Sequence, residues 1–444
     1  MKRFVIWGVF ALMVGVVCAA QAGKQAGYIK FDEYMLDNGL RVVLSEDKSV
    51  PIVAVNIWYH VGSAHEEDGR SGFAHLFEHM MFEGSENVAK REHNDLIQRA
   101  GGNLNATTNE DRTKYWEMLP ANTLELALWL EADRMRALAV TEETFENQRS
   151  AVKEERLMRI DNQPYGAAFL TADTLAFDFK PYSHTVIGKM VDLDAAEVDD
   201  VQNFFDKYYA PSNAVLVVVG DINKGDTKKW IKKYFGDIPR GPDVPPIAGE
   251  EPPHTAERRK VIEDRNANVP AVFINFMIPE HTNADTPALS LLSNVLSGGE
   301  SSRLYLKMVK EDQVSVAVFG SADTRRGPGV FRVIAAANVG QSIEANEAAI
   351  YSELERLKTE GIPEEELEKA KAQFKAGFIM GRETAIEKAE AIQHYAFYHG
   401  GLAAMNTDLD VYMAVTVEDI KRVANKYFTE ENRTVVIANP AGGS

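Results

Sequence analysis

Cysteine is almost absent from the sequence. The only one in 444 residues is Cys18. It lies in an N-terminal segment that we expect to be removed on export, as argued next. The mature chain is therefore expected to have no disulfide bond and no thiol nucleophile, whatever the redox state of its compartment.

Long apolar runs are missing after residue 22. No later segment approaches the roughly 18 apolar residues that a membrane-spanning helix needs. Residues 1–22 differ, because Lys2 and Arg3 precede an apolar run that ends in Ala20-Gln21-Ala22. This pattern predicts a signal peptide cleaved before Gly23, and the alternative is an uncleaved membrane anchor. We expect an exported protein without a stable membrane anchor, periplasmic if the source is a bacterium with two membranes.

Positive charge is also scarce. The chain has 48 Lys and Arg against 66 Asp and Glu, a formal charge of −18, which becomes −20 when Lys2 and Arg3 leave with the signal. Such an acidic chain is a poor candidate for nucleic-acid binding. A hydrophobic content of 45% and a charged content of 26% are typical of a soluble globular protein. At this length, more than one domain is expected.

One segment of the sequence occurs twice. "EVDDVQNFFDKYYAPSNAVLVVVGD" (197–221) resembles "TVEDIKRVANKYFTEENRTVVIANP" (416–440), and an offset of 219 residues aligns Tyr208 with Tyr427 and Asn213 with Asn432. Each copy reads as an amphipathic helix, a turn and a β-branched strand. Such pairs are common, so coincidence is the alternative. A repeat distance near half the mature chain predicts two duplicated domains.

A proline-rich stretch separates the two predicted domains. Residues 236–257 hold six prolines and several glycines, which suits an extended linker. We expect an N-terminal domain over 29–240, a linker over 241–257 and a homologous C-terminal domain over 258–444. In both halves the predicted strands are grouped and not strictly alternated with helices, which favours α+β sandwiches. Predicted helices cover 122–137, 141–160, 165–177, 284–296, 341–360 and 363–400.

The stretch "SGFAHLFEHMMFEGSE" (71–86) is apolar except for three chemically active side chains. His75, Glu78 and His79 fall on one stripe of a helix. Buried imidazoles and carboxylates are costly unless they are paired or bound to a ligand, so a hydrogen-bonded polar stripe is the simplest alternative. Histidines at i and i+4 can bind one Zn²⁺, and Glu78 could then take a proton from a zinc-bound water. The motif predicts a zinc site with Glu78 as general base.

Two histidines and a water leave a tetrahedral zinc site one ligand short, and hydrolytic sites usually add a carboxylate. Phe145, Gln148, Val152 and Glu155 share one face of the helix predicted over 141–160, whereas Glu154 points about 100° away. Periodicity alone does not decide whether Glu155 is a metal ligand or an ordinary charged residue on a glutamate-rich helix.

His-x-x-Glu-His is the inverted zinc motif, and the chain resembles the pitrilysin-like (M16) metallopeptidases. It is most similar to the short, two-domain members related to the mitochondrial processing peptidase. The resemblance runs from about residue 33 to the C-terminus and includes "LDNGLRVVLSED", "GFAHLFEHMMFEGSE", "NLNATTNEDRTKYW", "AVKEERL" and "LSGGESSRLYLKMVKED". Members of the family carry a zinc-binding glutamate in an "AV-x-x-E" pattern. In this chain that residue is Glu155, 76 residues after His79.

The resemblance also implies two α+β domains of the metallohydrolase type that close like a clam shell around a chamber. It implies that a peptide substrate adds as a strand to a sheet edge, with Asn105, Ala106 and Thr107 as contacts. An ordinary hairpin edge is the alternative for these three residues. Many relatives have a glutamate where this chain has Gln148. An amide can still hydrogen-bond a ligand but adds no negative charge around the metal.

A second departure concerns an Arg and Tyr pair, six or seven residues apart, in the C-terminal domain of complete family enzymes. The pair holds the substrate and polarises its scissile carbonyl. Here Lys310 stands in place of the Arg, and Val316 or Ala317 in place of the Tyr. The sequence therefore looks like the zinc-carrying half of a two-chain enzyme. We expect a homologous partner subunit that supplies the pair, or otherwise a homodimer.

The sequence thus predicts a zinc-dependent endopeptidase with one Zn²⁺ per chain, held by His75, His79 and Glu155. Its substrates would be peptides or unfolded segments that fit into the chamber. Two other classes stay open, because fold does not imply function. One is a non-catalytic structural core subunit of a larger assembly, and the other is a peptide-binding protein that does not cleave.

Overall fold

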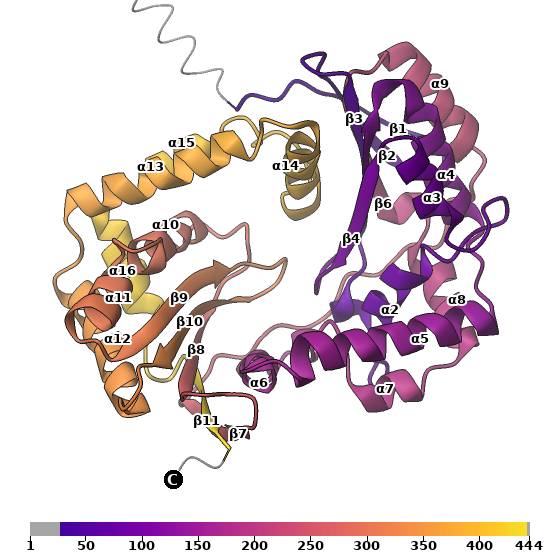
Figure 1. Cartoon of the computed structure of the whole chain (residues 1–444). Helices are drawn as coiled ribbons and strands as arrows, with labels where there is room; N and C mark the ends of the chain where they lie inside the picture. Colours follow the sequence, from indigo (N-terminus) through magenta and orange to yellow (C-terminus); the bar gives the residue numbers. More distant parts are fainter. Residues whose placement is uncertain (1–26, 442–444) are drawn as a thin grey trace, which may run out of the picture.

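The computed structural model describes residues 27–441 of the chain as two α+β halves that face each other (Figure 1). The prediction of two α+β sandwiches is confirmed. The predicted signal peptide and Cys18 lie outside the described residues, and the predicted domain limits stay a prediction. The strands of one sheet fall within residues 32–220 and those of the other within residues 258–440.

The first half is built on a six-stranded mixed sheet with the order β1-β2-β6-β3-β5-β4. β4 lies at the edge of this sheet and pairs with β5 alone among the described strands. The strands are β1 (Asp32–Met35), β2 (Arg41–Glu46), β3 (Ile52–Tyr59), β4 (Asn103–Thr108), β5 (Thr113–Pro120) and β6 (Ala214–Gly220). The main helices are α2 (Phe73–Met80), α3 (Glu92–Arg99), α4 (Leu124–Arg136), α5 (Glu142–Arg156), α6 (Gly166–Ala176), α7 (Met190–Asp194), α8 (Val198–Tyr208) and α9 (Lys224–Phe235).

The second half repeats this plan around a five-stranded sheet with the order β7-β11-β8-β10-β9. Its strands are β7 (Arg258–Asp264), β8 (Ala271–Ile278), β9 (Ser315–Asp323), β10 (Gly329–Ala337) and β11 (Arg433–Pro440). Its main helices are α10 (Thr286–Ser297), α12 (Ile343–Thr359), α13 (Glu364–Met380), α14 (Ala385–Tyr398), α15 (Asp408–Met413) and α16 (Val417–Tyr427). A short helix, α11 (Arg303–Tyr305), continues into a wider turn, η6 (Leu306–Glu311).

The two halves exchange one helix. α6 leaves the first half and packs on β8 and β11, whereas α14 leaves the second half and packs on β3 and β6 (Figure 1). Gly166 and Ala385, the first residues of the two helices, are 219 positions apart, which is the repeat distance. Each sheet is therefore buried on both faces, by its own helices outside and by the exchanged helix inside. This explains why β6 and β8 are apolar almost throughout, since such strands cannot alternate with polar residues.

Matching polar contacts fix each exchanged helix. On β3, the Asn56 side-chain amide donates to Glu390 of α14 at 2.8 Å, and Lys114 of β5 donates to the same carboxylate at 2.6 Å. On β8, Asn275 occupies the equivalent position and donates to the Ala172 carbonyl of α6 at 3.1 Å. Arg332 of β10 completes that side with an ion pair to Asp173 of α6.

The repeated asparagine seen in the sequence has one structural role in both halves. The Asn213 side-chain amide donates to the Tyr208 carbonyl at 2.9 Å, and Asn432 donates to the Tyr427 carbonyl at 2.7 Å. Each bond satisfies a carbonyl at the end of a helix, where the helix itself supplies no partner. The asparagine thus sets the turn between the repeated helix and strand.

Two features differ from the sequence predictions. The helix predicted over 363–400 is two helices, because α13 ends at Met380 and α14 begins at Ala385. Thr384 caps α14, accepting from the Glu387 backbone N–H while the Glu387 carboxylate accepts from Thr384, a capping box that fixes a new helix start. β1 and β7, each at one of the two edges of its sheet, were not predicted, because they are mostly exposed and lack an apolar pattern.

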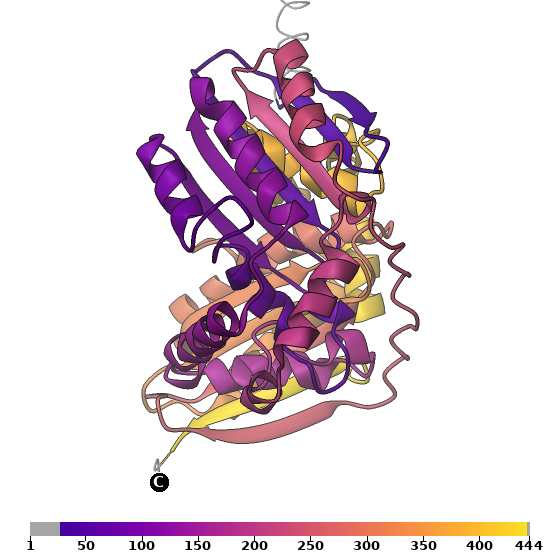
Figure 2. The ribbon, with the colours of Figure 1, turned by 90° about the vertical axis from the view of Figure 1, so that its right-hand side faces the viewer.

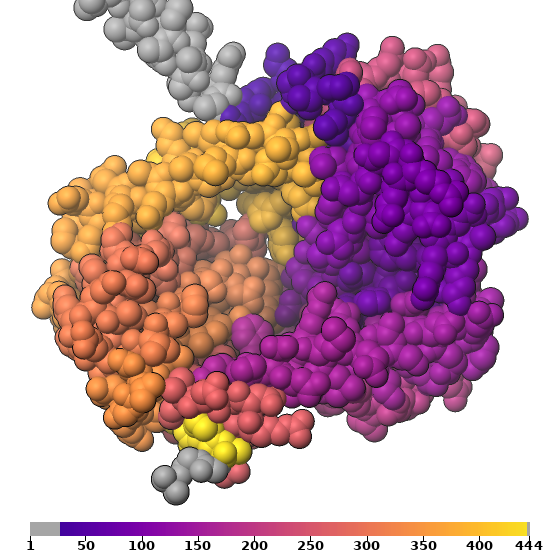
Figure 3. All heavy atoms as spheres, in the orientation of Figure 1, coloured from indigo at the N-terminus to yellow at the C-terminus, as the bar shows by residue number. Residues whose placement is uncertain are grey.

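The stretch between α9 and β7 runs extended along one side of the molecule (Figure 2). It joins the two halves without secondary structure, as the prolines predict. Within residues 27–441, no helix is long and apolar enough to cross a membrane. The space-filling view shows a hollow between the two halves (Figure 3).

An ion pair between Asp47, after β2, and Lys388 of α14 should make the contact between the halves sensitive to acid. The bond to Lys388 lowers the pKa of Asp47 from 3.8 to about 2. Its stabilising effect is therefore complete above about pH 4 and is lost as the pH falls through about 2. We expect Asp47→Asn to lower the free energy of unfolding by about 1 kcal/mol at pH 6, measured by urea denaturation.

This difference between wild type and Asp47→Asn should shrink as the pH is lowered from 4 towards 2. Asp37→Asn is a matched control, because Asp37 is exposed. A difference for Asp47→Asn that stays constant from pH 6 to pH 3 would contradict the assignment.

Candidate metal centre

The motif helix α2 starts where the backbone at Gly72 lies very close to the backbone of Ile187 and Gly188. Gly72 has φ +93°, and a β-carbon there would lie 2.9 Å from the Ile187 carbonyl oxygen and 3.0 Å from Gly188. Glycine is therefore required at this position. The buried carboxylate of Glu66 accepts from the backbone N–H groups of Gly72 and Ala74 at 2.9 and 2.8 Å. A carboxylate at a helix N-terminus stabilises the helix, so α2 is held firmly at the end that precedes His75.

Helix α5 brings the third candidate ligand to α2. Thr141 caps α5, and Phe145, Gln148 and Val152 are buried. Glu155 lies near the end of this same face, whereas Glu154 is exposed. α5 packs directly against α2. The buried face of α5 therefore places the Glu155 carboxylate beside the histidine motif of α2.

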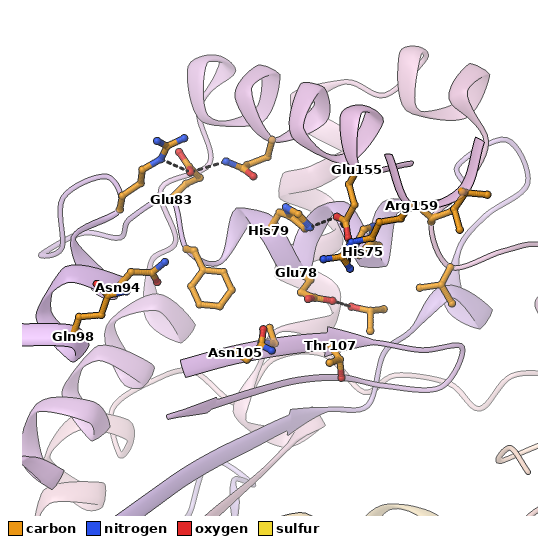
Figure 4. A pocket seen from close by; sticks show the side chains of 18 of the residues that line it. His75, Glu78, His79, Glu83, Asn94, Gln98, Asn105, Thr107, Glu155 and Arg159 are labelled. Carbon is orange, nitrogen blue, oxygen red and sulfur yellow. Dashed lines mark hydrogen bonds and ion pairs between the residues drawn. The ribbon is translucent and has the colours of Figure 1, made fainter. Parts of the chain in front are cut away.

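Three donor atoms converge between the two helices (Figure 4). A Glu155 carboxylate oxygen lies 3.2 Å from His79 Nε2 and 3.5 Å from His75 Nε2. Tetrahedral zinc with bonds of about 2.0–2.2 Å places its ligand atoms about 3.3 Å apart. Two imidazole nitrogens and a carboxylate oxygen at these separations fit a zinc ion.

The protonation of these groups also matches a site for a cation. Burial lowers the pKa of His75 to about 4, so its imidazole is neutral at pH 7. Hydrogen bonding to His79 lowers the pKa of Glu155, which keeps it ionised. Burial works against a charge on His79, but the bond to Glu155 and the nearby carboxylates outweigh it and raise the pKa of His79. The position between His79 and Glu155 therefore favours positive charge.

Glu78 lies on the side of α2 that faces β4. One of its carboxylate oxygens accepts from the Thr108 hydroxyl at 2.6 Å (Figure 4). Burial raises the pKa of Glu78, and the bond from Thr108 opposes this shift. Raising the pKa of a carboxylate makes it a stronger base, which is what proton transfer near neutral pH requires. Glu78 is thus beside the candidate ligands and is not needed as a ligand itself.

The edge strand β4 borders the same cavity, of about 900 Å³, as His75, Glu78, His79 and Glu155. Asn105, Ala106 and Thr107 all line it. The Ala106 backbone N–H donates to the side chain of Asn105 at 2.9 Å. Among the described strands β4 pairs with β5 alone, so its outer side has the geometry that strand addition requires.

Glu83 is a site residue that the sequence analysis missed. It is 3% exposed, and its carboxylate accepts from the Gln148 side-chain amide at 2.6 Å. Gln148 also lies near His79 and contributes to raising the pKa of that imidazole. A carboxylate thus lies behind Gln148, but Arg91 and Lys90 lie 3.6 and 3.8 Å from it and offset its negative charge. The available signal was spacing, because Glu83 follows His79 by four residues, but it lies beyond the end of α2.

Arg159 was also not anticipated. It follows Glu155 by four residues, and its guanidinium lies 2.8 Å from the second oxygen of that carboxylate (Figure 4). This contact leaves the other carboxylate oxygen directed at the histidines. Lys310, Val316 and Ala317 lie on η6 and β9, and the Val316 side chain is exposed.

A paired α+β fold with an inverted His-x-x-Glu-His motif beside a strand edge is typical of zinc metallopeptidases. Comparison with known families agrees with this class. Residues 41–188 match the family model "Insulinase (Peptidase family M16)", and residues 195–374 match "Peptidase M16 inactive domain". The chain is 30% identical to the zinc protease PqqE of Helicobacter pylori, over 99% of this chain and 100% of that protein.

The chain therefore belongs to peptidase family M16, in its short, two-domain form. The crystal structure of a protease from Helicobacter pylori matches with a TM-score of 0.89 and 31% identity, covering 93% of this chain and 100% of that one. The periplasmic protease PqqL of Escherichia coli matches with a TM-score of 0.77 and 17% identity, over 92% of this chain but 47% of that one. The second likeness shows the fold alone, and this chain spans about half of that protein.

Proposed function

We propose that the chain is a zinc-dependent endopeptidase that hydrolyses peptides or unfolded segments able to enter the cavity. One observation carries the proposal. His75, His79 and Glu155 converge beside the buried base Glu78, in a cavity bordered by the free edge of β4. A general base beside a ligand set, facing a strand edge that can hold a peptide, is the arrangement that peptide hydrolysis needs.

Each residue has a distinct role in this proposal. Zinc held by His75, His79 and Glu155 would supply Lewis acidity, which makes water a nucleophile near neutral pH. Glu78 takes the proton of the attacking water and returns it to the leaving amine, while Thr108 fixes the orientation of its carboxylate. The edge of β4 aligns the peptide backbone through main-chain hydrogen bonds.

Metal removal tests the proposal. We expect the purified zinc-loaded chain to cleave a mixed set of quenched fluorescent peptides, and cleavage to fall to background after dialysis against a chelator. Added Zn²⁺ should restore it and added Ca²⁺ should not, because calcium requires six to eight oxygen ligands. Cleavage that persists after zinc has been shown analytically to be absent would contradict the zinc role.

We further propose that full activity requires a homologous partner chain bearing an Arg and a Tyr. By the family resemblance, Lys310 stands in place of the Arg and Val316 or Ala317 in place of the Tyr, and an aliphatic side chain cannot donate a hydrogen bond. This chain covers 47% of the PqqL chain, so PqqL has about twice its length. A partner chain would take the place of the additional half of PqqL. An inert zinc-loaded chain that gains turnover when the partner is added would support this. A chain that is fully active alone would overturn it.

A structural or peptide-binding role without cleavage is the second candidate. The match of residues 195–374 to the inactive-domain model favours it. The four site residues count against it, because a scaffold needs none of them. Peptide binding with no turnover, with every partner tried, would favour this second role.

We also propose that the protein acts after export, in the periplasm of a cell with two membranes. The charged start, apolar run and Ala20-Gln21-Ala22 support this. Fractionation of cells that express the whole chain or residues 23–444 tests it. Only the whole chain should reach the periplasm.

A further inference from the structure

Three histidines far apart in the sequence meet at the junction of the two halves. His281 lies in the loop after β8, His394 lies in α14, and His399 is the C-cap of α14. One ring nitrogen from each lies within 4.8 Å of the other two. The loop belongs to the second half, whereas α14 is the helix exchanged onto the sheet of the first.

The surroundings of His281 orient its ring towards its partners. Its backbone N–H donates to the Arg325 carbonyl at 2.8 Å, and its Nδ1 lies 2.8 Å from the Thr324 hydroxyl. With Nδ1 as the donor, Nε2 carries a lone pair, and this atom lies 3.0 Å from His394 Nε2. A hydroxyl or carbonyl that fixes the outer nitrogen of an imidazole is the usual support of a metal-binding histidine.

The third ring has a free nitrogen. His399 Nε2 is buried and has no hydrogen-bond partner within residues 27–441. A buried polar atom without a partner is costly, and a bound ion would satisfy it. All three side chains are half-buried, so an ion could enter and keep a water ligand.

A second buried cluster, formed by His93, Glu117 and Glu131, does not support the same argument. The guanidinium of Arg134 already pairs with Glu131, and His93 Nε2 bonds Glu117 at 2.6 Å. All three members are fully buried, so neither a vacant position nor a route for an ion remains. The histidine cluster differs because it is half-buried, has no guanidinium paired with it among the described residues, and includes the partnerless His399 Nε2, although His394 Nε2 and His281 Nε2 lie within hydrogen-bond distance at 3.0 Å.

We propose that His281, His394 and His399 form a second metal site, for a transition-metal ion of the zinc class, separate from the site at His75, His79 and Glu155. Three imidazoles with an open fourth position suit Zn²⁺ and its neighbours, and exclude Ca²⁺ and Mg²⁺, which prefer oxygen. A nitrogen separation of 3.0 Å is close to the roughly 3.3 Å of two ligands on one tetrahedral ion. The ion would fasten the end of α14 to the loop after β8.

The test counts zinc per chain after equilibrium dialysis, by elemental analysis. We expect two Zn²⁺ per wild-type chain, one in His399→Ala, one in the double variant His75→Ala/His79→Ala, and none when all three changes are combined. His399→Ala removes an imidazole whose Nε2 has no hydrogen-bond partner within residues 27–441, so folding should persist and is checked by circular dichroism. Substitution with Co²⁺, whose visible absorption reports ligation by the protein, gives a second count.

Tyr398→Phe is the matched control, since it removes a hydroxyl beside the cluster and leaves the three imidazoles. It should keep two Zn²⁺ per chain. Added Zn²⁺ should also raise the Tm of His75→Ala/His79→Ala but not of the triple variant. The proposal is overturned if folded His75→Ala/His79→Ala binds no zinc, or if His399→Ala binds as much as wild type. In that case the contact between His394 Nε2 and His281 Nε2 is only a hydrogen bond.

Discussion

Glu78→Gln should lower peptide turnover by about 10²- to 10⁴-fold while leaving the zinc content unchanged. That range is the usual contribution of a general base, and an amide cannot accept the proton of the attacking water. The side chains that would hold zinc, His75, His79 and Glu155, are not altered. Glutamine matches glutamate in size and can still accept the bond from the Thr108 hydroxyl. The measurement is kcat/KM on the fluorescent peptides beside elemental analysis of both proteins.

Glu154→Gln is the matched control for this experiment. Glu154 immediately precedes Glu155 but is exposed, so its turnover should equal that of wild type. If Glu78→Gln keeps wild-type turnover in zinc-loaded protein, Glu78 is not the base and the proposed mechanism fails. If neither protein turns over peptide, even with the partner chain, the structural role becomes the better account.

Arg134→Met should lower the free energy of unfolding by about 3–5 kcal/mol, the usual effect of removing one partner of a buried ion pair. Arg134 is 1% exposed and its Nε donates to Glu131 at 3.0 Å. Its guanidinium also lies 4.4 Å from the ring centroid of Tyr115. Without Arg134, the carboxylate of Glu131 stays buried with no cation, beside the carboxylate of Glu117.

Urea denaturation followed by circular dichroism measures this loss. Burial already raises the pKa of Glu131 to about 7, so its charged form destabilises the fold as the pH rises from about 4.5 through that value. Arg134 lowers the pKa of Glu131, so removing it raises that pKa further and leaves the ionised carboxylate without compensation. The loss in Arg134→Met should therefore be larger at pH 8 than at pH 6. Arg136→Met, an exposed change in the same helix, should stay within about 0.5 kcal/mol of wild type.

Arg134→Met/Glu131→Gln completes the comparison, because it removes both charges. It should be more stable than Arg134→Met, since no unpaired charge remains. If the double variant is no more stable than Arg134→Met, the loss comes from packing of the arginine side chain and not from the stranded carboxylate.

Local periodicity explains how much of the metal centre could be predicted from the sequence. His75, Glu78 and His79 lie within one turn and a half of helix, so their proximity follows from helix geometry alone. Glu155 required the family resemblance, because periodicity gives the face of α5 but not what that face contacts. Glu83 lies after α2 has ended, where helical spacing no longer applies.

Long-range pairing explains what could not be predicted. His281 and His394 are 113 residues apart, and no local pattern links a loop after β8 to the far end of α14. The helix predicted over 165–177 matches α6, but the sequence did not indicate which sheet this helix packs against. Its buried residues are alanines, Ala168, Ala172 and Ala176, which indicate close packing but not against which sheet.

The exchange of α6 and α14 has a consequence for the origin of the chain. A half-length protein with this plan could not cover the inner face of its own sheet. Its helix would have to pack on the sheet of a second copy, and the helix of that copy on its own sheet. Such a reciprocal exchange is domain swapping in a symmetric homodimer. Fusion of two copies of its gene would leave two corresponding helices 219 residues apart, each seated on the opposite sheet. The present chain is then equivalent to a covalent dimer in which the first half alone carries the His-x-x-Glu-His motif.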